Sequence, residues 1–286
     1  MGEPVTPNAP PLPRPRILRQ SWLDLTFVHW AVDPASIAHF YPAGTRPDVF
    51  EGRAYVGLIP FRMVATGFAR GPALIGDFLE TNIRLYSVDA TGRRGVFFLS
   101  LDTNRLDVVA VARTVFGLPY RWASMRYAVD ADVHTYTTTK LRHVVGRAED
   151  TRAADEAVAS QGGTGAGTGE SDEAVEAGAG AGAGELNDAI ASRVVVRVGK
   201  PVDPKPLEHF LTARWGLHVR RAGRTWYLPN EHPVWPLRSA ELLDLRAARL
   251  LASVGLPDLT ARAPDHVAHS PGVRSYFGLP RGSASR

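Results

Sequence analysis

The stretch that decides the fold is residues 79–102. It reads Leu79-Glu80-Thr81-Asn82-Ile83-Arg84-Leu85-Tyr86, then a turn, then Gly95-Val96-Phe97-Phe98-Leu99-Ser100-Leu101-Asp102. Side chains alternate between the two faces of a β-strand. One face of the first strand is therefore apolar and suits a core. The other face presents an acid, an amide, a guanidinium and a phenol, from Glu80, Asn82, Arg84 and Tyr86. We expect a β-hairpin whose polar face is a candidate pocket wall, and the alternative is an ordinary strand side that faces solvent.

The register of this hairpin decides which residues of the second strand join the polar row. If Arg84 lies opposite Ser100, then Asn82 faces Asp102 and the polar side chains cluster. A slip of one residue places apolar side chains opposite them instead. The sequence leaves both registers open. In the first register, Ser100 and Asp102 are candidate ligand-binding residues together with Asn82, Arg84 and Tyr86.

Composition limits the class of protein. The chain has 286 residues, enough for one large domain or two small ones. It has no cysteine, which excludes disulfides and thiolate metal sites and fits a reducing cytoplasm. No apolar run approaches the roughly 20 residues of a membrane-spanning helix, so we expect no membrane contact. Residues 1–16 are rich in proline and are predicted to be a disordered tail, and residues 17–286 a single β-rich domain.

The charge is unevenly distributed. Residues 149–188 contain ten acids and one base, and the rest of the chain has 32 bases and 19 acids. The bases of that remainder are scattered along the chain, whereas a nucleic-acid interface needs them clustered with exposed aromatic residues. We therefore expect no nucleic-acid partner. An excess of positive charge is compatible with an anionic small molecule.

Residues 149–188 also contain the glycine-rich runs Gly-Gly-Thr-Gly-Ala-Gly-Thr-Gly and Ala-Gly-Ala-Gly-Ala-Gly. Such a segment cannot bury enough apolar surface to order itself. Its glycines do not follow a strand and open a helix, as phosphate-binding loops do. It is predicted to be a disordered insertion between two strands.

The remaining patterns predict about ten strands and four short helices. Helices are expected to begin at Asp33-Pro34, Thr103-Asn104, Asp203-Pro204 and Ser239. Strands come in runs instead of alternating with helices. The fold class is therefore predicted to be α+β with a mainly antiparallel sheet.

Several of these stretches together resemble a known family. They are Phe27-Val28-His29-Trp30, residues 52–61, residues 80–86, residues 98–102, Leu118-Pro119-Tyr120 and residues 232–237. In this order and spacing they resemble the YqjF-like family of uncharacterised bacterial proteins, over about residues 17–280 apart from the insertion. The structural relatives of that family are acetoacetate decarboxylases. The resemblance therefore implies a curved sheet or barrel that encloses a cavity, with short peripheral helices.

The decarboxylases form a Schiff base on a lysine of a Pro-Lys-Lys sequence, which follows an arginine at a fixed offset. In this chain Arg113 and Pro119 keep the offset, but the lysine pair is Tyr120-Arg121. Neither residue forms an imine. The resemblance thus implies the fold without the decarboxylase chemistry. It also makes Glu80 the counterpart of a glutamate that these enzymes place in the cavity.

These residues define a candidate site. Glu80 is a candidate general acid or base, provided that burial raises its pKa. Arg84 and Arg121 can hold a carboxylate or phosphate by bidentate contact, and Tyr120 can donate a hydrogen bond. The alternative is structural: Glu80 and Arg84 form a buried ion pair and Tyr120 fills the core.

Other chemistries lack a motif. The nine histidines include no His-x-His and no His-Glu-x-x-His, and neither His29 and His143 on strands nor His232 in a loop indicates a metal site. Ser100 lacks the Gly-x-Ser-x-Gly elbow of many hydrolases. We expect no metal and no cofactor, and the oligomeric state stays open. The leading hypothesis is a protein that binds a small anionic or carbonyl-bearing metabolite. The alternatives are a non-catalytic structural or partner-binding protein and a divergent decarboxylase.

Overall fold

The structure is a computed structural model that describes residues 2–139 and 190–282. The predicted insertion 149–188 and a predicted strand at 141–147 lie outside the described residues. The described strands are β1 (Leu18–Val32), β2 (Thr45–Pro47), β3 (Ala54–Phe68), β4 (Phe78–Asp89), β5 (Arg94–Thr103), β6 (Tyr120–Trp122), β7 (Ser124–Asp130), β8 (Val133–Thr139), β9 (Ile190–Pro201), β10 (Gly216–Arg221), β11 (Arg224–Glu231), β12 (Arg238–Arg246), β13 (His266–Phe277) and β14 (Arg281–Gly282). The short α-helices are α1 (Pro34–Ile37), α2 (Leu106–Val111), α5 (Pro206–Thr212) and α6 (Ala248–Ala252).

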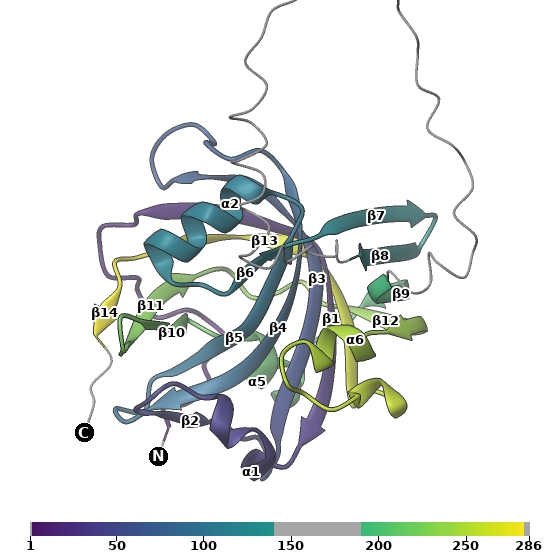
Figure 1. Ribbon diagram of the computed structural model, residues 1–286, viewed down its shortest axis with the longest axis horizontal. Coiled ribbons are helices and arrows are strands. Elements are labelled where there is room, and N and C mark those ends of the chain that lie inside the picture. Colours follow the sequence, from purple (N-terminus) through teal and green to yellow (C-terminus); the bar gives the residue numbers. More distant parts are fainter. Residues whose placement is uncertain (1, 140–189, 283–286) are drawn as a thin grey trace, which may run out of the picture. The chain divides into compact units, whose positions relative to one another are not determined.

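Seven strands close into a ring, which we call the barrel (Figure 1). Their order is β1, β3, β4, β5, β10, β11 and β13, and the ring closes because β13 pairs with both β11 and β1. All neighbours in the ring are antiparallel except β5 and β10, which run parallel. The expected mainly antiparallel, curved sheet with short helices is confirmed. A closed sheet has an interior that can hold a ligand.

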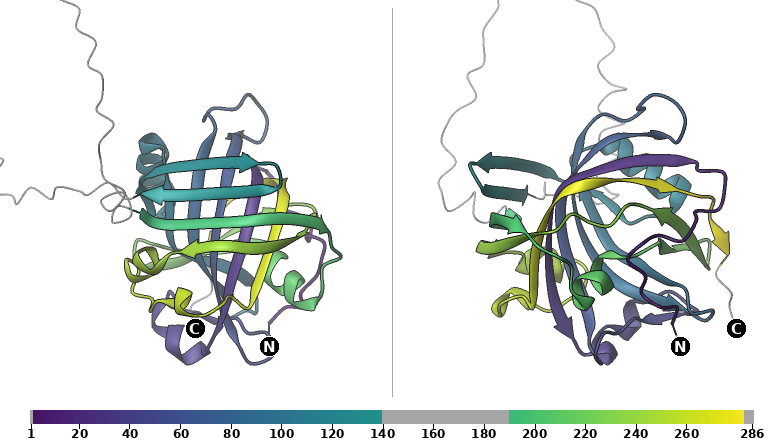
Figure 2. Two further views of the ribbon diagram at one scale, coloured as in Figure 1. Left: turned by 90° about the vertical axis from the view of Figure 1, so that its right-hand side faces the viewer. Right: turned by 180° about the vertical axis from the view of Figure 1, so that it is seen from behind.

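The strands β12, β9, β8 and β7 extend the sheet from β13 and form what we call the wing. Figure 2 shows the wing strands crossing over the outer side of β1 and β13. A hydrophobic cluster fills the space between them. Trp30, Leu58 and Ile83 contribute from the barrel, and Tyr136 and Val196 from the wing. The outer face of the barrel is therefore a buried core and not a solvent surface.

The ends of α1 and α2 follow the sequence signals. The Asp33 carboxylate accepts a hydrogen bond from the Ala35 backbone N–H at 2.9 Å, which caps α1 as predicted. The helical segment that begins with α2 ends at Gly117, whose φ of +68° is the left-handed conformation that glycine adopts readily. Among the residues that the structure describes, no helix has the length and apolar character needed to cross a bilayer.

The prediction that a helix begins at Ser239 is wrong. Residues 238–246 form β12, and only Ala248–Ala252 is helical. Exposure alternates along β12, with Ala240 and Leu242 partly buried and Leu243 exposed. The leucines of this stretch fit a helical repeat as well as a strand repeat. Pairing with β9, which gives the backbone its ladder partners, favours the strand.

The predicted N-terminal tail has defined contacts with the barrel. The Glu3 backbone N–H donates to the Gly92 carbonyl at 2.8 Å. The Leu12 side chain is buried, and its backbone N–H donates to the Glu231 carboxylate at 3.2 Å. Composition alone did not predict these contacts, because the proline content of a segment does not reveal which surface the segment packs against.

Candidate functional site

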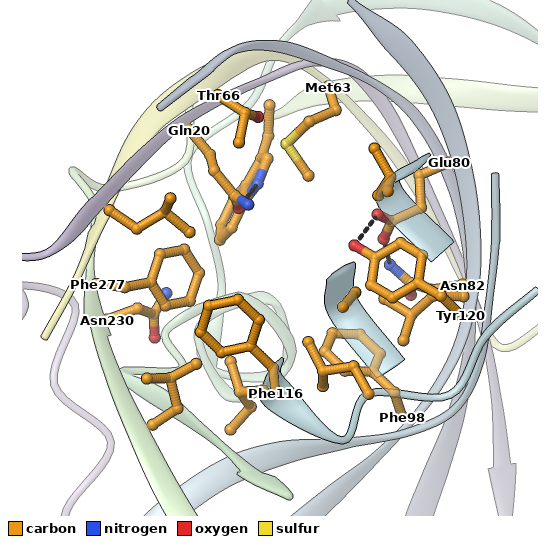
Figure 3. Close-up of a pocket in the computed structure, with 18 of the residues that line it drawn as sticks. Gln20, Met63, Thr66, Glu80, Asn82, Phe98, Phe116, Tyr120, Asn230 and Phe277 are labelled. Carbon is orange, nitrogen blue, oxygen red and sulfur yellow. Dashed lines mark hydrogen bonds between the residues drawn. The ribbon is translucent and has the colours of Figure 1, made fainter. Parts of the chain in front are cut away.

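The barrel encloses a cavity of about 400 Å³, within the usual range for small-molecule sites. Its walls are mostly apolar and include Leu25, Ile59, Phe98, Leu101 and Trp235. The side of α2 closes one end, where Val108 and Ala112 line the cavity. A few polar groups interrupt this wall. Figure 3 shows Glu80, Asn82 and Tyr120 on one side and Asn230 on the opposite side.

Glu80 is the central polar group of the cavity. It is only 2% exposed, and within the described residues it has no ion pair with a basic side chain. The Tyr120 hydroxyl donates to its Oε2 at 2.7 Å, and the Asn82 amide donates to its Oε1 at 3.2 Å. Burial raises the pKa of Glu80 to about 7, and the two hydrogen bonds offset only part of that rise. Near neutral pH this carboxyl group can therefore both give and accept a proton.

The register of the β4–β5 hairpin explains which residues face the cavity. Ile83 pairs with Ser100 and Thr81 with Asp102, and Leu99 bulges out of the ladder before Arg84 pairs with Phe98. Directly paired residues share a face of the sheet. Glu80, Asn82 and Arg84 consequently face inward with Phe98 and Leu101, which all line the cavity. The hairpin adopts the register that places apolar residues opposite the polar row.

Ser100, Asp102 and Arg121 lie on the other face of the sheet, and none of them lines the cavity. The Arg121 Nε donates to the Asp102 carboxylate at 2.7 Å, and its Nη1 donates to the Ser253 hydroxyl at 3.0 Å. The sequence placed these three residues in the cavity, and the structure corrects that placement. Because Arg84 and Arg121 lie on opposite faces, they do not hold one ligand together.

The Arg84 guanidinium has no acidic partner among the described residues. Its Nε donates to the Tyr86 hydroxyl at 3.0 Å and its Nη2 donates to the Leu211 carbonyl at 3.1 Å, and within the described residues it forms no salt bridge. The second arginine of the cavity wall, Arg214, is paired with Asp48. The alternative ion pair between Glu80 and Arg84 is not formed. Four residues of strand separate their Cα atoms by roughly 13 Å.

Tyr86 accepts a hydrogen bond from Arg84 but does not itself face the cavity. It is fully buried, is not among the cavity-lining residues, and its hydroxyl also lies 2.6 Å from the His29 Nε2. The His29 Nδ1 in turn lies 3.1 Å from the His266 Nδ1. Burial lowers the pKa of both histidines and raises the pKa of Tyr86. Tyr86 is thus part of a neutral buried network that positions the Arg84 guanidinium, and not a ligand contact.

Sequence reasoning missed the polar groups of the far wall. Gln20, Asn230 and His232 line the cavity and come from β1, β11 and the segment after β11. Each stands among other polar residues that do not line the cavity, such as Arg19 and Glu231, so no local pattern marks it. Burial lowers the pKa of His232 to about 4, which leaves it neutral near pH 7. The Asn82 Oδ1 is buried without a hydrogen-bond donor.

A family model described as an uncharacterized conserved protein, domain of unknown function 2071, matches residues 19–274. The chain belongs to this family. It is also similar to the uncharacterized protein YqjF of Bacillus subtilis (strain 168), with 33% identity over 126 residues. That match covers 43% of this chain and 52% of the relative, so the chain spans about half the length of this curated relative.

Solved structures with the same fold are distant in sequence. Acetoacetate decarboxylase from Legionella pneumophila aligns with a TM-score of 0.54 and 13% identity, over 96% of this chain and 92% of that one. An acetoacetate decarboxylase-like enzyme from Sphingomonas wittichii aligns with a TM-score of 0.54 and 10% identity, over 95% of both chains. The enduracididine biosynthesis enzyme MppR complexed with pyruvate aligns with a TM-score of 0.51 and 15% identity, over 95% of this chain and 92% of that one. These similarities show an acetoacetate decarboxylase-like fold.

The cavity offers no amine for imine chemistry from the described residues. Lys200 and Lys205 do not line it, and Lys140 lies outside the described residues. At the Tyr120-Arg121 pair, the tyrosine faces the cavity and the arginine faces away. The groups that the cavity does offer are a protonatable carboxyl, an unpaired guanidinium and a phenol, within apolar walls.

Proposed function

We propose that the chain binds a small carboxylate with an apolar body in the barrel cavity, and that Glu80 exchanges a proton with it. One observation carries the proposal: Glu80 and Arg84 face the same cavity of about 400 Å³, and among the residues that the structure describes Glu80 has no cationic partner and Arg84 no anionic one. A carboxylate bound at Arg84 supplies the anion that the protein does not provide.

The walls define the rest of the ligand. The apolar side chains around Ile59, Phe98 and Leu101 favour a hydrocarbon body. A carbonyl or hydroxyl group near Glu80 finds a donor in the protonated carboxyl and an acceptor in the Asn82 Oδ1. A 2-oxo acid combines these features. MppR, which has the same fold, is complexed with pyruvate, and this supports 2-oxo acids as the first probes.

The reaction class that suits Glu80 is proton transfer at the carbon next to a carbonyl. Ionised Glu80 takes the proton, and the electron pair of the broken C–H bond forms the C=C bond of an enolate. The carbonyl oxygen gains the negative charge, which a nearby hydrogen-bond donor such as the second N–H of the Asn82 amide stabilises. Return of the proton restores the substrate. In D2O this exchange replaces that hydrogen with deuterium.

Binding is tested with 4-methyl-2-oxopentanoate, which has a branched apolar body, and with 4-methyl-2-pentanone, which lacks the carboxylate. Trp22 and Trp235 line the cavity, so their fluorescence reports occupancy. We expect the oxo acid to bind and the ketone to bind much more weakly. Arg84→Gln should weaken oxo-acid binding about 10–100-fold, because it removes a charged hydrogen-bond donor. Arg121→Gln, on the other face, is the matched control and should bind normally.

Equal affinity in wild type and Arg84→Gln, or a loss confined to Arg121→Gln, would contradict the binding site. Deuterium incorporation into the oxo acid, followed by NMR, tests the role of Glu80 separately. Glu80→Gln should abolish catalysed exchange while the oxo acid still binds. Exchange at the wild-type rate in Glu80→Gln would remove Glu80 from the mechanism.

The two alternative hypotheses make different demands on the cavity. A purely structural role is favoured by an interior filled with side chains, and a volume of about 400 Å³ argues against it. A divergent decarboxylase requires a cavity lysine for its imine, and none of the described lysines lines the cavity. Borohydride trapping with acetoacetate should accordingly give no covalent adduct.

A further inference from the structure

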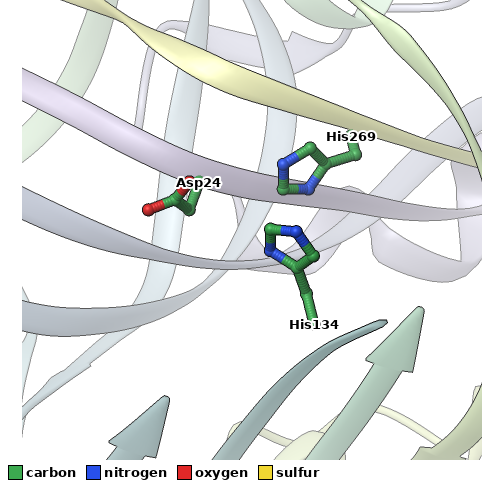
Figure 4. A group of neighbouring side chains, drawn as sticks. All are labelled: Asp24, His134 and His269. Atoms are coloured by element: carbon green, nitrogen blue, oxygen red, sulfur yellow. The ribbon is translucent and has the colours of Figure 1, made fainter. Parts of the chain in front are cut away.

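A second cluster of functional side chains lies outside the barrel, where the wing packs on β1 and β13. Asp24 of β1, His134 of β8 and His269 of β13 each place one donor atom within 4.8 Å of the others (Figure 4). None of the three lines the cavity. The cluster is thus separate from the proposed ligand site and needs its own explanation.

Hydrogen bonds select the tautomer of His269. The Thr26 hydroxyl donates its only proton to the Tyr136 hydroxyl at 3.4 Å, and Tyr136 donates its own to the Asp24 carbonyl at 2.6 Å. The Thr26 oxygen, 3.3 Å from the His269 Nδ1, can therefore only accept. The His269 Nδ1 must carry the proton. In the neutral ring, Nε2 then has the free lone pair that a metal ion needs.

The Nδ1 of each ring lies against a neighbouring hydroxyl group. The His269 Nδ1 lies 3.3 Å from the Thr26 hydroxyl, and the His134 Nδ1 lies 2.8 Å from the Tyr127 hydroxyl. Neutral imidazoles whose Nδ1 is held by another group are typical of metal-binding histidines. In the described part of the chain, neither Nε2 makes a hydrogen bond.

Asp24 lies at a backbone irregularity of β1. Its φ of +51° is unusual for a non-glycine residue, and the ladder with β3 shifts register between Leu23 and Val28. A bulge of this kind re-aims one side chain without moving the rest of the strand. The Arg62 Nη1 donates to the Asp24 Oδ2 at 3.0 Å. The Tyr127 hydroxyl also forms a hydrogen bond with the Asp24 side chain, and the two contacts together orient the carboxylate.

We propose that Asp24, His134 and His269 bind one first-row divalent transition-metal ion through two imidazole nitrogens and a carboxylate oxygen. Two nitrogen donors and one oxygen donor suit Zn²⁺ or Fe²⁺. Donors about 2.0–2.2 Å from one ion lie at most about 4.4 Å apart, so small side-chain rotations close the site. Three protein ligands leave coordination positions open. The ion also links β8 of the wing to β1 and β13 of the barrel.

Metal binding is measured on tag-free chain after chelator treatment, by calorimetric titration with Zn²⁺ and by the visible absorption of bound Co²⁺. We expect one ion per chain. His134→Gln and Asp24→Asn should each weaken Zn²⁺ binding at least about 100-fold and abolish the Co²⁺ bands. Asp132→Asn is the matched control, because Asp132 is an exposed carboxylate on the same hairpin as His134 and lies outside the cluster.

Absence of stoichiometric binding, or equal Zn²⁺ affinity in wild type and His134→Gln, would overturn the proposal. Circular dichroism verifies that each variant is folded before titration. Glu80→Gln should bind Zn²⁺ like wild type, because its side chain lies inside the barrel. The metal site is thereby tested independently of the cavity ligand.

Discussion

Tyr120 and Arg121 are neighbours in β6, and each binds a buried carboxylate on a different face of the same sheet. Tyr120 donates to Glu80 in the cavity, and Arg121 donates to Asp102 on the outer face. Both carboxylates are almost fully buried, at 2% and 0% exposure. Asp102 has a charged partner, whereas Glu80 has only a phenol and an amide.

This difference distinguishes the structural carboxylate of Asp102 from the proposed functional carboxylate of Glu80. A buried carboxylate that is paired with a positive charge stays ionised, so it is not available for proton transfer. A buried carboxyl with neutral partners keeps a raised pKa, and such groups are typical of ligand and catalytic sites. The two faces should therefore respond in opposite directions to removal of their carboxylates.

The largest effect is expected for Asp102→Ala. It leaves the Arg121 guanidinium, which is 24% exposed, without its carboxylate. We expect the free energy of unfolding to fall by about 3 kcal/mol, as measured by urea denaturation. The double variant Asp102→Ala/Arg121→Met should recover part of that loss. A loss of only a few tenths of a kcal/mol in Asp102→Ala would show that the outer pair is not structural.

At alkaline pH, Glu80→Gln should raise the free energy of unfolding relative to wild type, whereas Asp102→Ala lowers it. The folded-state pKa of about 7 lies above the ordinary glutamate value of 4.5, so folding favours the protonated form. The wild-type stability from this group is fully present below pH 4.5 and is lost as pH rises through about 7. Glutamine does not titrate. The free energy of unfolding of the variant should therefore increase relative to that of wild type by on the order of 3 kcal/mol between pH 4.5 and pH 8.

Urea denaturation at several pH values measures this gain. The control is Glu241→Gln, which changes an exposed carboxylate of the wing and should show no such trend. A Glu80→Gln stability difference that stays constant from pH 4.5 to pH 8 would contradict the raised pKa.

Tyr120→Phe should have an intermediate effect. It removes the hydroxyl that stabilises ionised Glu80, so the pKa of Glu80 should rise further. We expect a loss of about 1–2 kcal/mol in the free energy of unfolding, larger at pH 8 than at pH 5. Arg197→Gln, on the exposed face of the wing, should leave the pH at which stability falls unchanged. An unaltered pH dependence in Tyr120→Phe would break the link between Tyr120 and Glu80.

The smallest effect is expected on the exposed face of the wing. Arg197 pairs with Glu241 at 2.6 Å, but the two side chains are 47% and 64% exposed. Exposed pairs contribute little, so Arg197→Ala should change the free energy of unfolding by less than about 0.5 kcal/mol. A loss comparable to that of Asp102→Ala would mean that burial does not determine how much an ion pair contributes to the free energy of unfolding.

The sequence predicts one half of the central hairpin well. In β4 the alternation of side chains is clean, and it correctly places Glu80, Asn82 and Arg84 on the cavity face. In β5 the run Phe97-Phe98-Leu99 has no alternation, so nothing local reveals that Leu99 bulges. That bulge fixes the register and sends Ser100 and Asp102 to the outer face.

Contacts between distant segments are the other part that the sequence does not reveal. Asp24, His134 and His269 come from three strands and share no short spacing. They form no local motif, and the expectation of no metal site was based on local motifs alone. The strand at Arg238–Arg246 was missed for a related reason, because pairing with β9 decides its conformation. Local patterns predict which face a residue occupies, and only the ladder partners determine what that face meets.

The central claim is that Glu80 is a buried carboxyl without a charged partner, poised to exchange a proton. It is tested most directly by ¹³C NMR titration of the Glu80 side-chain carboxyl, with Glu80→Gln used to assign the signal. The account predicts a titration midpoint of about 7. A midpoint at or below the ordinary glutamate value of about 4.3 would contradict it.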